Sequence, residues 1–135
     1  MKKKRDSGLF IDDISYNIGL LEEFTKEGKI EFNRSVKTQM AVIKCIENIG
    51  EAIKNLDDET KNIVPHEEWS AISKTRDFFA HHYFGIDTEL VWEIAQQDIP
   101  SLKSSIEKII AEKRLREEKQ KQQTQKNPPH HKMKI

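Results

Sequence analysis

Residues 69–85, WSAISKTRDFFAHHYFG, determine how the rest of the chain can be interpreted. Apolar and aromatic side chains recur here at spacings of three and four, which predicts one stripe along an α-helix: Trp69, Ile72, Phe79 and Tyr83. Arg76 occupies the position in this stripe where another apolar residue is expected. Because a guanidinium stays charged and is costly to bury alone, we expect Arg76 to meet a carboxylate or to face a cleft that receives an anion.

Two polar residues follow Arg76 on the same expected helix. His81 is the kind of side chain that changes its charge near neutral pH, and Asp77, four residues before it, should lie alongside and orient the imidazole. Arg76 and His81 are five residues apart and diverge by roughly 140° on a regular helix. The long arginine side chain, the helix end near Gly85 or a second copy of the chain must therefore bring them together, and dimerisation is the natural solution.

The spacing Arg76-x4-His81-x-Tyr83 resembles the Arg-x4-His-x-Tyr motif of the HepT-like toxins, members of the HEPN superfamily of all-helical ribonucleases. Flanking runs are similar as well, and they occur in the family's order: IGEA at 49–52, YFGID at 83–87, VWEI at 91–94 and IPSL at 99–102. The similarity covers about residues 8–112. One departure is Asp77, where the family often has Asn after the arginine.

The residues of the motif suit RNA cleavage without a metal ion. A base removes the proton of the 2′-hydroxyl, whose oxygen attacks the neighbouring phosphorus, and an acid protonates the leaving 5′-oxygen. Histidine suits the proton transfers and arginine the phosphoryl charge, so His81 is the expected base or acid and Arg76 the phosphate clamp. Tyr83 could stack on a base or bind a phosphate. The expected products carry a 2′,3′-cyclic phosphate and a 5′-hydroxyl.

The resemblance implies further features. It implies an up-and-down helical bundle of about four to five helices that forms a homodimer, with RNA as substrate and no cofactor. It places Glu51 near the Arg76–His81 cleft, where the carboxylate could pair with Arg76. It also implies a nucleotidyltransferase antitoxin as partner, which transfers AMP from ATP onto Tyr83 and so blocks phosphate binding.

Two alternatives of other classes remain open from the sequence. One is a catalytically silent helical subunit that binds a nucleotidyltransferase partner or a nucleotide. The other is a dimeric scaffold built on the helix that follows Asn33. Neither alternative requires His81 for chemistry, so the two are distinguished from the enzyme by the effect of His81→Ala.

Composition sets limits on function. The 135 residues have a net charge of zero, but residues 6–111 carry 11 positive and 20 negative charges, a net −9, whereas residues 112–135 carry a net +5. An acidic body is a poor general platform for nucleic acid, so we expect RNA to bind in a local cleft.

The single cysteine, Cys45, is expected to be a buried inert thiol. The sequence contains no glycine-rich phosphate loop, zinc-ligand pattern, secretory signal or membrane-length apolar run, which indicates a cytoplasmic protein without a metal or cofactor.

Apolar periodicity predicts the helices of an all-α fold, with Asp6 or Ser7, Asp57-Asp58 and Asp87 as expected helix caps. We expect a helical domain over residues 1–111 and a charged helical extension with a disordered tail over 112–135. The expected helices cover residues 7–27, 33–56, 65–85, from 88 to a break at 98–100, and from Pro100 onward, with a short turn at 59–63. The helix from Asn33 has the longest stripe and should be the spine of the bundle: Val36, Met40, Ile43, Ile46, Ile49, Ile53 and Leu56.

Overall fold

The computed structural model describes residues 6–81 and 87–126, and of residues 76–81 and 126 it describes the backbone alone. Within these ranges the chain is helical and contains no β-strand, which confirms the predicted all-α class. The elements are α1 (Ser7–Thr25), α2 (Lys29–Arg34), α3 (Val36–Lys54), α4 (Asp58–Lys61), α5 (Trp69–His81), α6 (Thr88–Glu93), the π-helix η2 (Ile94–Asp98) and α7 (Ile99–Lys126).

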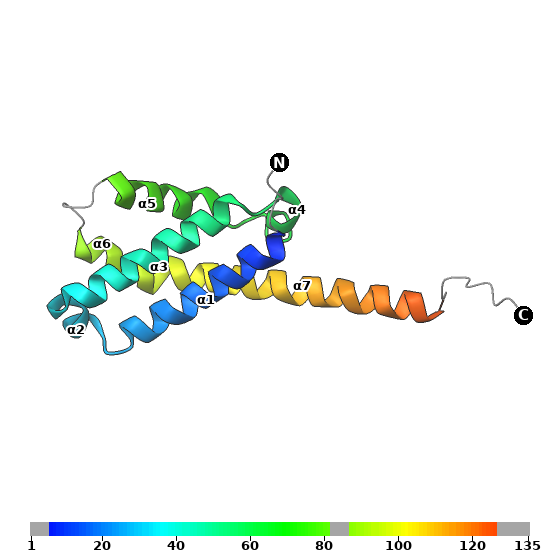
Figure 1. The fold of residues 1–135 in the computed structure, drawn as a ribbon, viewed down its shortest axis with the longest axis horizontal. Helices are drawn as coiled ribbons and strands as arrows, with labels where there is room; N and C mark the ends of the chain where they lie inside the picture. Colours follow the sequence, from blue (N-terminus) through cyan, green and yellow to red (C-terminus); the bar gives the residue numbers. More distant parts are fainter. Residues whose placement is uncertain (1–5, 82–86, 127–135) are drawn as a thin grey trace, which may run out of the picture.

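The long helices alternate in direction and form an up-and-down bundle (Figure 1). Helix α3 packs against both α1 and α5, and α7 packs against α1 (Figure 1). Helices α1 and α5 run opposite to α3, whereas the continuous segment of α6, η2 and α7 runs in the same direction as α3. The last turns of α7 extend past the bundle as a single helix. The predicted spine is therefore confirmed, because α3 lies between two neighbours.

The core is built from the inward faces of these helices. Its fully buried side chains are mostly isoleucines and leucines: Ile14, Leu21, Ile46, Ile49, Ile53, Ile99, Leu102, Ile106 and Ile109, with Phe32 and Val42. The ring of Phe32 packs against Trp92, with centroids 5.2 Å apart. Cys45 is buried on α3, and desolvation raises the pKa of its thiol to about 11. The thiol therefore stays protonated at neutral pH, as expected for an inert core residue.

The helix starts follow the predicted capping chemistry. Asp6 accepts a hydrogen bond from the Gly8 backbone nitrogen, Asp57 from that of Thr60, and Asp87 from that of Glu89. Ser7 has another role, because its buried hydroxyl accepts a hydrogen bond from the Asp57 backbone nitrogen at 3.1 Å. This contact ties the start of α1 to the start of α4.

Three predicted boundaries are wrong. The spine helix begins at Val36 and is capped by the hydroxyl of Ser35, because residues 29–34 form the separate helix α2. The motif helix begins at Trp69 and not at Pro65, since the chain turns through residues 65–68. No break occurs at 98–100. The wider π turn of η2, in which the Ile99 nitrogen donates to the Ile94 carbonyl, leads into α7 before Pro100, which lacks the N–H of an ordinary helical residue.

The first turns of α3 depart from the predicted burial. Val36 and Met40 continue the stripe of the spine, yet their side chains are 70% and 38% exposed. Figure 1 shows the reason: α5 lies close to the C-terminal half of α3 and diverges from its N-terminal half. The apolar side chains of Phe24 and Leu90 are exposed as well, by 36% and 37%.

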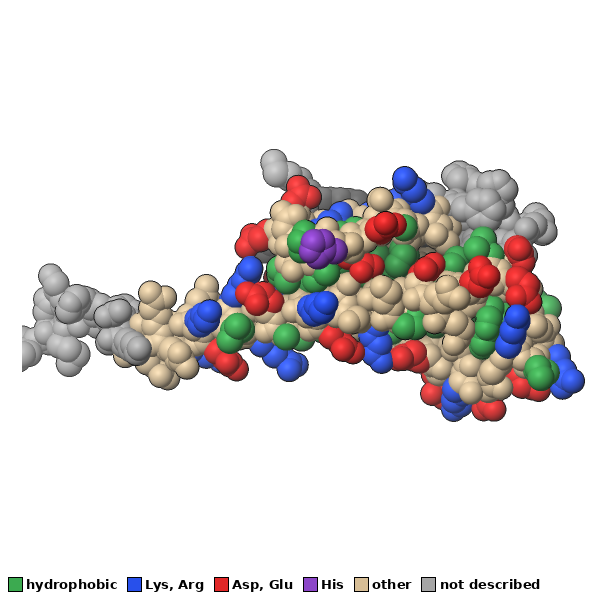
Figure 2. Space-filling view, turned by 180° about the vertical axis from the view of Figure 1, so that it is seen from behind, with side chains coloured by type: hydrophobic (Ala, Val, Ile, Leu, Met, Phe, Trp, Pro, Cys, Tyr) green, Lys and Arg blue, Asp and Glu red, His purple; other side chains and the backbone are tan. Residues whose placement is uncertain are grey.

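The surface shown in Figure 2 carries interspersed acidic and basic side chains over the bundle, and α7 projects from one end of it. From Arg114 to Gln125 every side chain of α7 is exposed, which agrees with an extension that buries nothing. None of the helices in the described part of the chain is long and apolar enough to cross a membrane.

Candidate active site

Helix α5 carries the backbone of the motif. Arg76, Asp77 and His81 lie on its last two turns, and their side chains are outside what the structure describes. Tyr83 and the expected helix end at Gly85 lie outside the described residues. The convergence of Arg76 and His81 and the orienting contact from Asp77 therefore remain predictions.

The first half of α5 is firmly attached to its neighbours. The indole nitrogen of Trp69 donates to the carbonyls of Lys61 and Val64, both at 3.3 Å, and Ile72 is buried in the core. The buried hydroxyl of Ser73 donates to the carbonyl of Gly50 on α3 at 3.2 Å. This interhelix bond fixes how far α5 is shifted along α3, and the motif begins one turn beyond it.

Glu51, the carboxylate expected near the motif, follows Gly50 on α3. Its side chain is exposed, and its carbonyl accepts a hydrogen bond from the side chain of Asn55 at 2.9 Å. Because α3 and α5 are antiparallel, Glu51 and Arg76 lie on opposite sides of the Gly50–Ser73 contact. At 1.5 Å per residue their backbones are about 6 Å apart along the helix axes. A long arginine side chain can span this separation, so pairing of Glu51 with Arg76 stays a prediction.

A groove runs along α5 on the side of η2 and α7. One part of it, 260 Å³, is lined by His66, Glu67, Glu68, Ala71, Ile72, Thr75, Asp98 and Ser101. A second part, 300 Å³, is lined by Lys74, Thr75, Leu90, Ile94 and Asp98 and so shares two residues with the first. Among the described residues that line this groove, carboxylates outnumber lysines and arginines, which disfavours RNA phosphates along that part of it. Its residues have no distinctive spacing in the sequence, so the groove could not be predicted.

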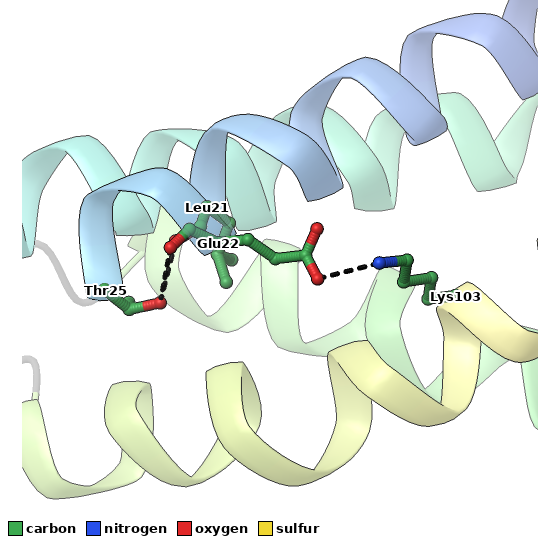
Figure 3. A network of polar contacts seen from close by, with 4 residues as sticks. All are labelled: Leu21, Glu22, Thr25 and Lys103. Carbon is green, nitrogen blue, oxygen red and sulfur yellow. Dashed lines mark hydrogen bonds and ion pairs between the residues drawn. The ribbon is translucent and has the colours of Figure 1, made fainter. Parts of the chain in front are cut away.

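A third cavity lies away from the motif, between α1 and the start of α7. It measures 260 Å³ and is spanned by the ion pair of Lys103 with Glu22, at 2.9 Å (Figure 3). The hydrogen bond and charge of Glu22 raise the pKa of Lys103. Beside this pair, the Thr25 hydroxyl donates to the Leu21 carbonyl at 2.9 Å (Figure 3). The Thr25 hydrogen bond lies within α1, whereas the Lys103–Glu22 pair joins α7 to α1, so we assign this pair to the packing of the two helices.

Metal-ligating side chains do not cluster around the motif helix as far as the structure describes them. Among those described side chains, no group of three or more His, Cys, Asp or Glu is placed to hold a metal ion. The side chains brought together near α5 are instead the interhelix anchors, above all Ser73 and Trp69, which pattern reasoning had assigned no role or a purely apolar one.

The sequence of the chain is similar to those of proteins named as ribonucleases. Residues 14–109 match the family model described as "Ribonuclease HepT-like". A protein of Thermococcus cleftensis named "Probable ribonuclease HepT" is 42% identical over 107 residues, which cover 78% of this chain and 97% of that protein. The "Putative RNase MJ0127" of Methanocaldococcus jannaschii is 40% identical over 108 residues, covering 79% of this chain and 89% of that protein. No solved structure matches the chain.

The family match starts within α1 and ends within α7, so it spans the helices that build the bundle and leaves out the projecting end of α7. The aligned residues also cover 97% and 89% of the lengths of these two relatives, so the similarity extends over nearly the whole of both. On the match, the identity and the all-helical architecture together, this chain belongs to the HepT-like ribonuclease family.

Proposed function

We propose that the protein is a metal-independent endoribonuclease whose catalytic residues are Arg76 and His81. The observation that carries the proposal is the Arg76-x4-His81-x-Tyr83 motif, whose arginine and histidine lie on one helix of a bundle that belongs to a ribonuclease family. The ribonuclease names of two relatives at 40% and 42% identity support the same reaction class.

In the proposed reaction the RNA supplies its own nucleophile. His81 acts as base or acid: it takes the proton of the 2′-hydroxyl or gives one to the leaving 5′-oxygen. The 2′-oxygen forms a bond to phosphorus while the bond from phosphorus to the 5′-oxygen breaks. Arg76 holds the phosphoryl oxygens as negative charge develops on them, and Asp77 orients His81. The products are a 2′,3′-cyclic phosphate and a 5′-hydroxyl.

The active form in this proposal is a homodimer. Arg76 and His81 are five residues apart on α5 and point in directions that differ by roughly 140° on a regular helix. Two copies of α5 at the edges of one cleft would let the arginine of one copy and the histidine of its partner face the same phosphate. The exposed Val36 and Met40, at the end of α3 from which α5 diverges, offer apolar surface for such contact.

We further propose that this ribonuclease is the toxin of a cytoplasmic toxin–antitoxin pair. Its antitoxin would be a nucleotidyltransferase that transfers AMP from ATP onto the Tyr83 hydroxyl, with release of pyrophosphate. The added nucleotide brings negative charge and bulk two residues from His81, which would block an RNA phosphate from reaching Arg76. This regulation rests on the family resemblance of the motif, including its tyrosine.

Cleavage of RNA by the purified chain in EDTA tests the proposed function. We expect the parent protein to cut RNA and leave cyclic-phosphate ends, and His81→Ala to lose this activity while it keeps its helical fold. The neighbouring His82→Ala is the matched control and should remain active, because His82 is not part of the Arg76-x4-His81-x-Tyr83 motif. A folded parent protein with unmodified Tyr83 that cuts no RNA would favour the catalytically silent, partner-binding subunit.

A further inference from the structure

Helix α3 presents a second carboxylate toward α5, and the sequence motif had not singled it out. Glu47 lies three residues before Gly50, the residue whose carbonyl accepts the hydrogen bond of Ser73. Residues three apart on a helix are surface neighbours, so Glu47 and Gly50 share the side of α3 that faces α5. Glu51, one residue after Gly50, is rotated by roughly 100° from it.

The antiparallel register brings Glu47 level with Arg76. Arg76 follows Ser73 by three residues on α5, and Glu47 precedes Gly50 by three on α3. Because the two helices run in opposite directions, both steps lead the same way from the Ser73–Gly50 contact (Figure 1). The backbones of Glu47 and Arg76 are therefore at nearly the same height, whereas Glu51 is about 6 Å from Arg76 along the axes.

The surroundings of Glu47 fit a carboxylate that needs a cation. Its side chain is 25% exposed, and its ion pair with Lys44 is long, at 3.9 Å, with a lysine that is itself 70% exposed. An exposed pair of this length contributes little. A partly desolvated carboxylate gains more from a second, closer cation, and the guanidinium of Arg76 carries five N–H donors for that purpose.

We infer that Glu47 pairs with Arg76 and is a positioning residue for the catalytic arginine. Glu47 would hold one edge of the planar guanidinium and leave the other edge for an RNA phosphate. This inference rests on the proposed function, in which Arg76 binds the phosphoryl group. It assigns to Glu47 the pairing that the motif resemblance suggested for Glu51.

A double-mutant cycle tests the pairing without any RNA. We expect Glu47→Gln to lower the urea midpoint of unfolding in the parent chain and to cause no further lowering in an Arg76→Gln chain. If Glu47 stabilised the fold only through Lys44, the midpoint would fall equally in both backgrounds. Glu31→Gln is the matched control, because it removes the same charge and a similar contact, that of Glu31 with Arg34 at 3.4 Å.

Cleavage kinetics test what the pairing does. If RNA is cut, Glu47→Gln should lower kcat/KM about tenfold, the size of a coupling of about 1.4 kcal/mol, whereas Glu31→Gln should leave it unchanged. Glu47→Asp keeps the charge, and its kcat/KM should lie between that of Glu47→Gln and that of the parent. If Glu47 and Arg76 are coupled in stability but the parent protein cuts no RNA, the proposed function is refuted and the pairing is not. Absence of coupling in an active parent, or coupling of Arg76 to Glu51 instead, would overturn the assignment of Glu47.

Discussion

Ser73 shows how one small side chain sets the position of two helices. Its hydroxyl is buried and donates to the backbone carbonyl of Gly50, which faces α5 without a side chain of its own. The sequence placed Gly50 inside a family-like run and Ser73 inside the motif helix, but no pattern links a serine to a glycine 23 residues away. Contacts of this kind depend on the tertiary register and have no local signal.

Replacing this hydroxyl should destabilise the bundle measurably. We expect Ser73→Ala to lower the free energy of unfolding by about 1 kcal/mol, because the Gly50 carbonyl loses a buried hydrogen bond. Thr75→Ala is the control, since the Thr75 hydroxyl donates to Ala71 within its own helix. That change should stay within about 0.5 kcal/mol. Equal urea midpoints for the two variants would contradict the anchoring role of Ser73.

Asp57 gives a prediction of pH dependence. Hydrogen bonds from the side chain and backbone of Thr60, at the start of α4, lower the pKa of this carboxyl below 3.8. The stabilisation from the cap is therefore complete above pH 3.8 and is lost as the pH falls through the lower, folded-state pKa. Asp57→Ala should cost about 1 kcal/mol at pH 7 and progressively less below pH 3.8.

Thermal unfolding of Asp57→Ala and its parent between pH 7 and pH 2.5 would measure this difference. Asp12→Ala, which removes an exposed carboxylate from the second turn of α1, should show no such loss at neutral pH. A constant difference between Asp57→Ala and its parent over the whole range would mean that the carboxylate charge does not contribute to the cap.

At the scale of the helices, the predictions were right where residues close in sequence determine the structure. Asp6, Asp57 and Asp87 cap helices as predicted, and the stripe of α3 from Ile43 onward is buried. The predicted helix boundaries were wrong where contacts with other parts of the chain determine them. Pro65 is compatible with a helix start, but the chain turns until Trp69, whose indole is held by the carbonyls of Lys61 and Val64. Pro100 suggested a break, but the π-helix η2 leads directly into α7, so the helical segment continues through Pro100.

The end of α7 is predicted to be dispensable for folding. Arg116 pairs with Glu112 at 3.1 Å and with Glu59 at 3.8 Å, and the side chains from Arg114 to Gln125 are exposed. Exposed ion pairs contribute at most about 1 kcal/mol. Removal of residues 112–135 should therefore leave the far-UV spectrum helical and change the free energy of unfolding by less than about 1 kcal/mol. Loss of cooperative unfolding would show that the extension belongs to the domain.

At the scale of the whole molecule, the sequence predicted the fold class and the order of the long helices because apolar periodicity and caps repeat along the chain. It named the catalytic candidates Arg76 and His81 from their spacing and flanking runs. It could not predict how α3 and α5 are shifted along each other, and this register is the observation behind the proposed pairing of Arg76 with Glu47 in place of Glu51. Nor did it indicate that α5 diverges from the start of α3 and leaves Val36 and Met40 exposed.

The central claim is that Arg76 and His81 act as one pair across a dimer. Mixing separately purified Arg76→Ala and His81→Ala chains tests it most directly, because a mixed dimer holds one intact pair, the arginine of one copy and the histidine of the other. We expect each variant alone to be inactive and an equal mixture to recover about a quarter of the parental RNA cleavage, the statistical yield of such pairs. Native mass spectrometry would confirm that mixed dimers form. Mixed dimers without activity, or activity in either variant alone, would contradict the claim.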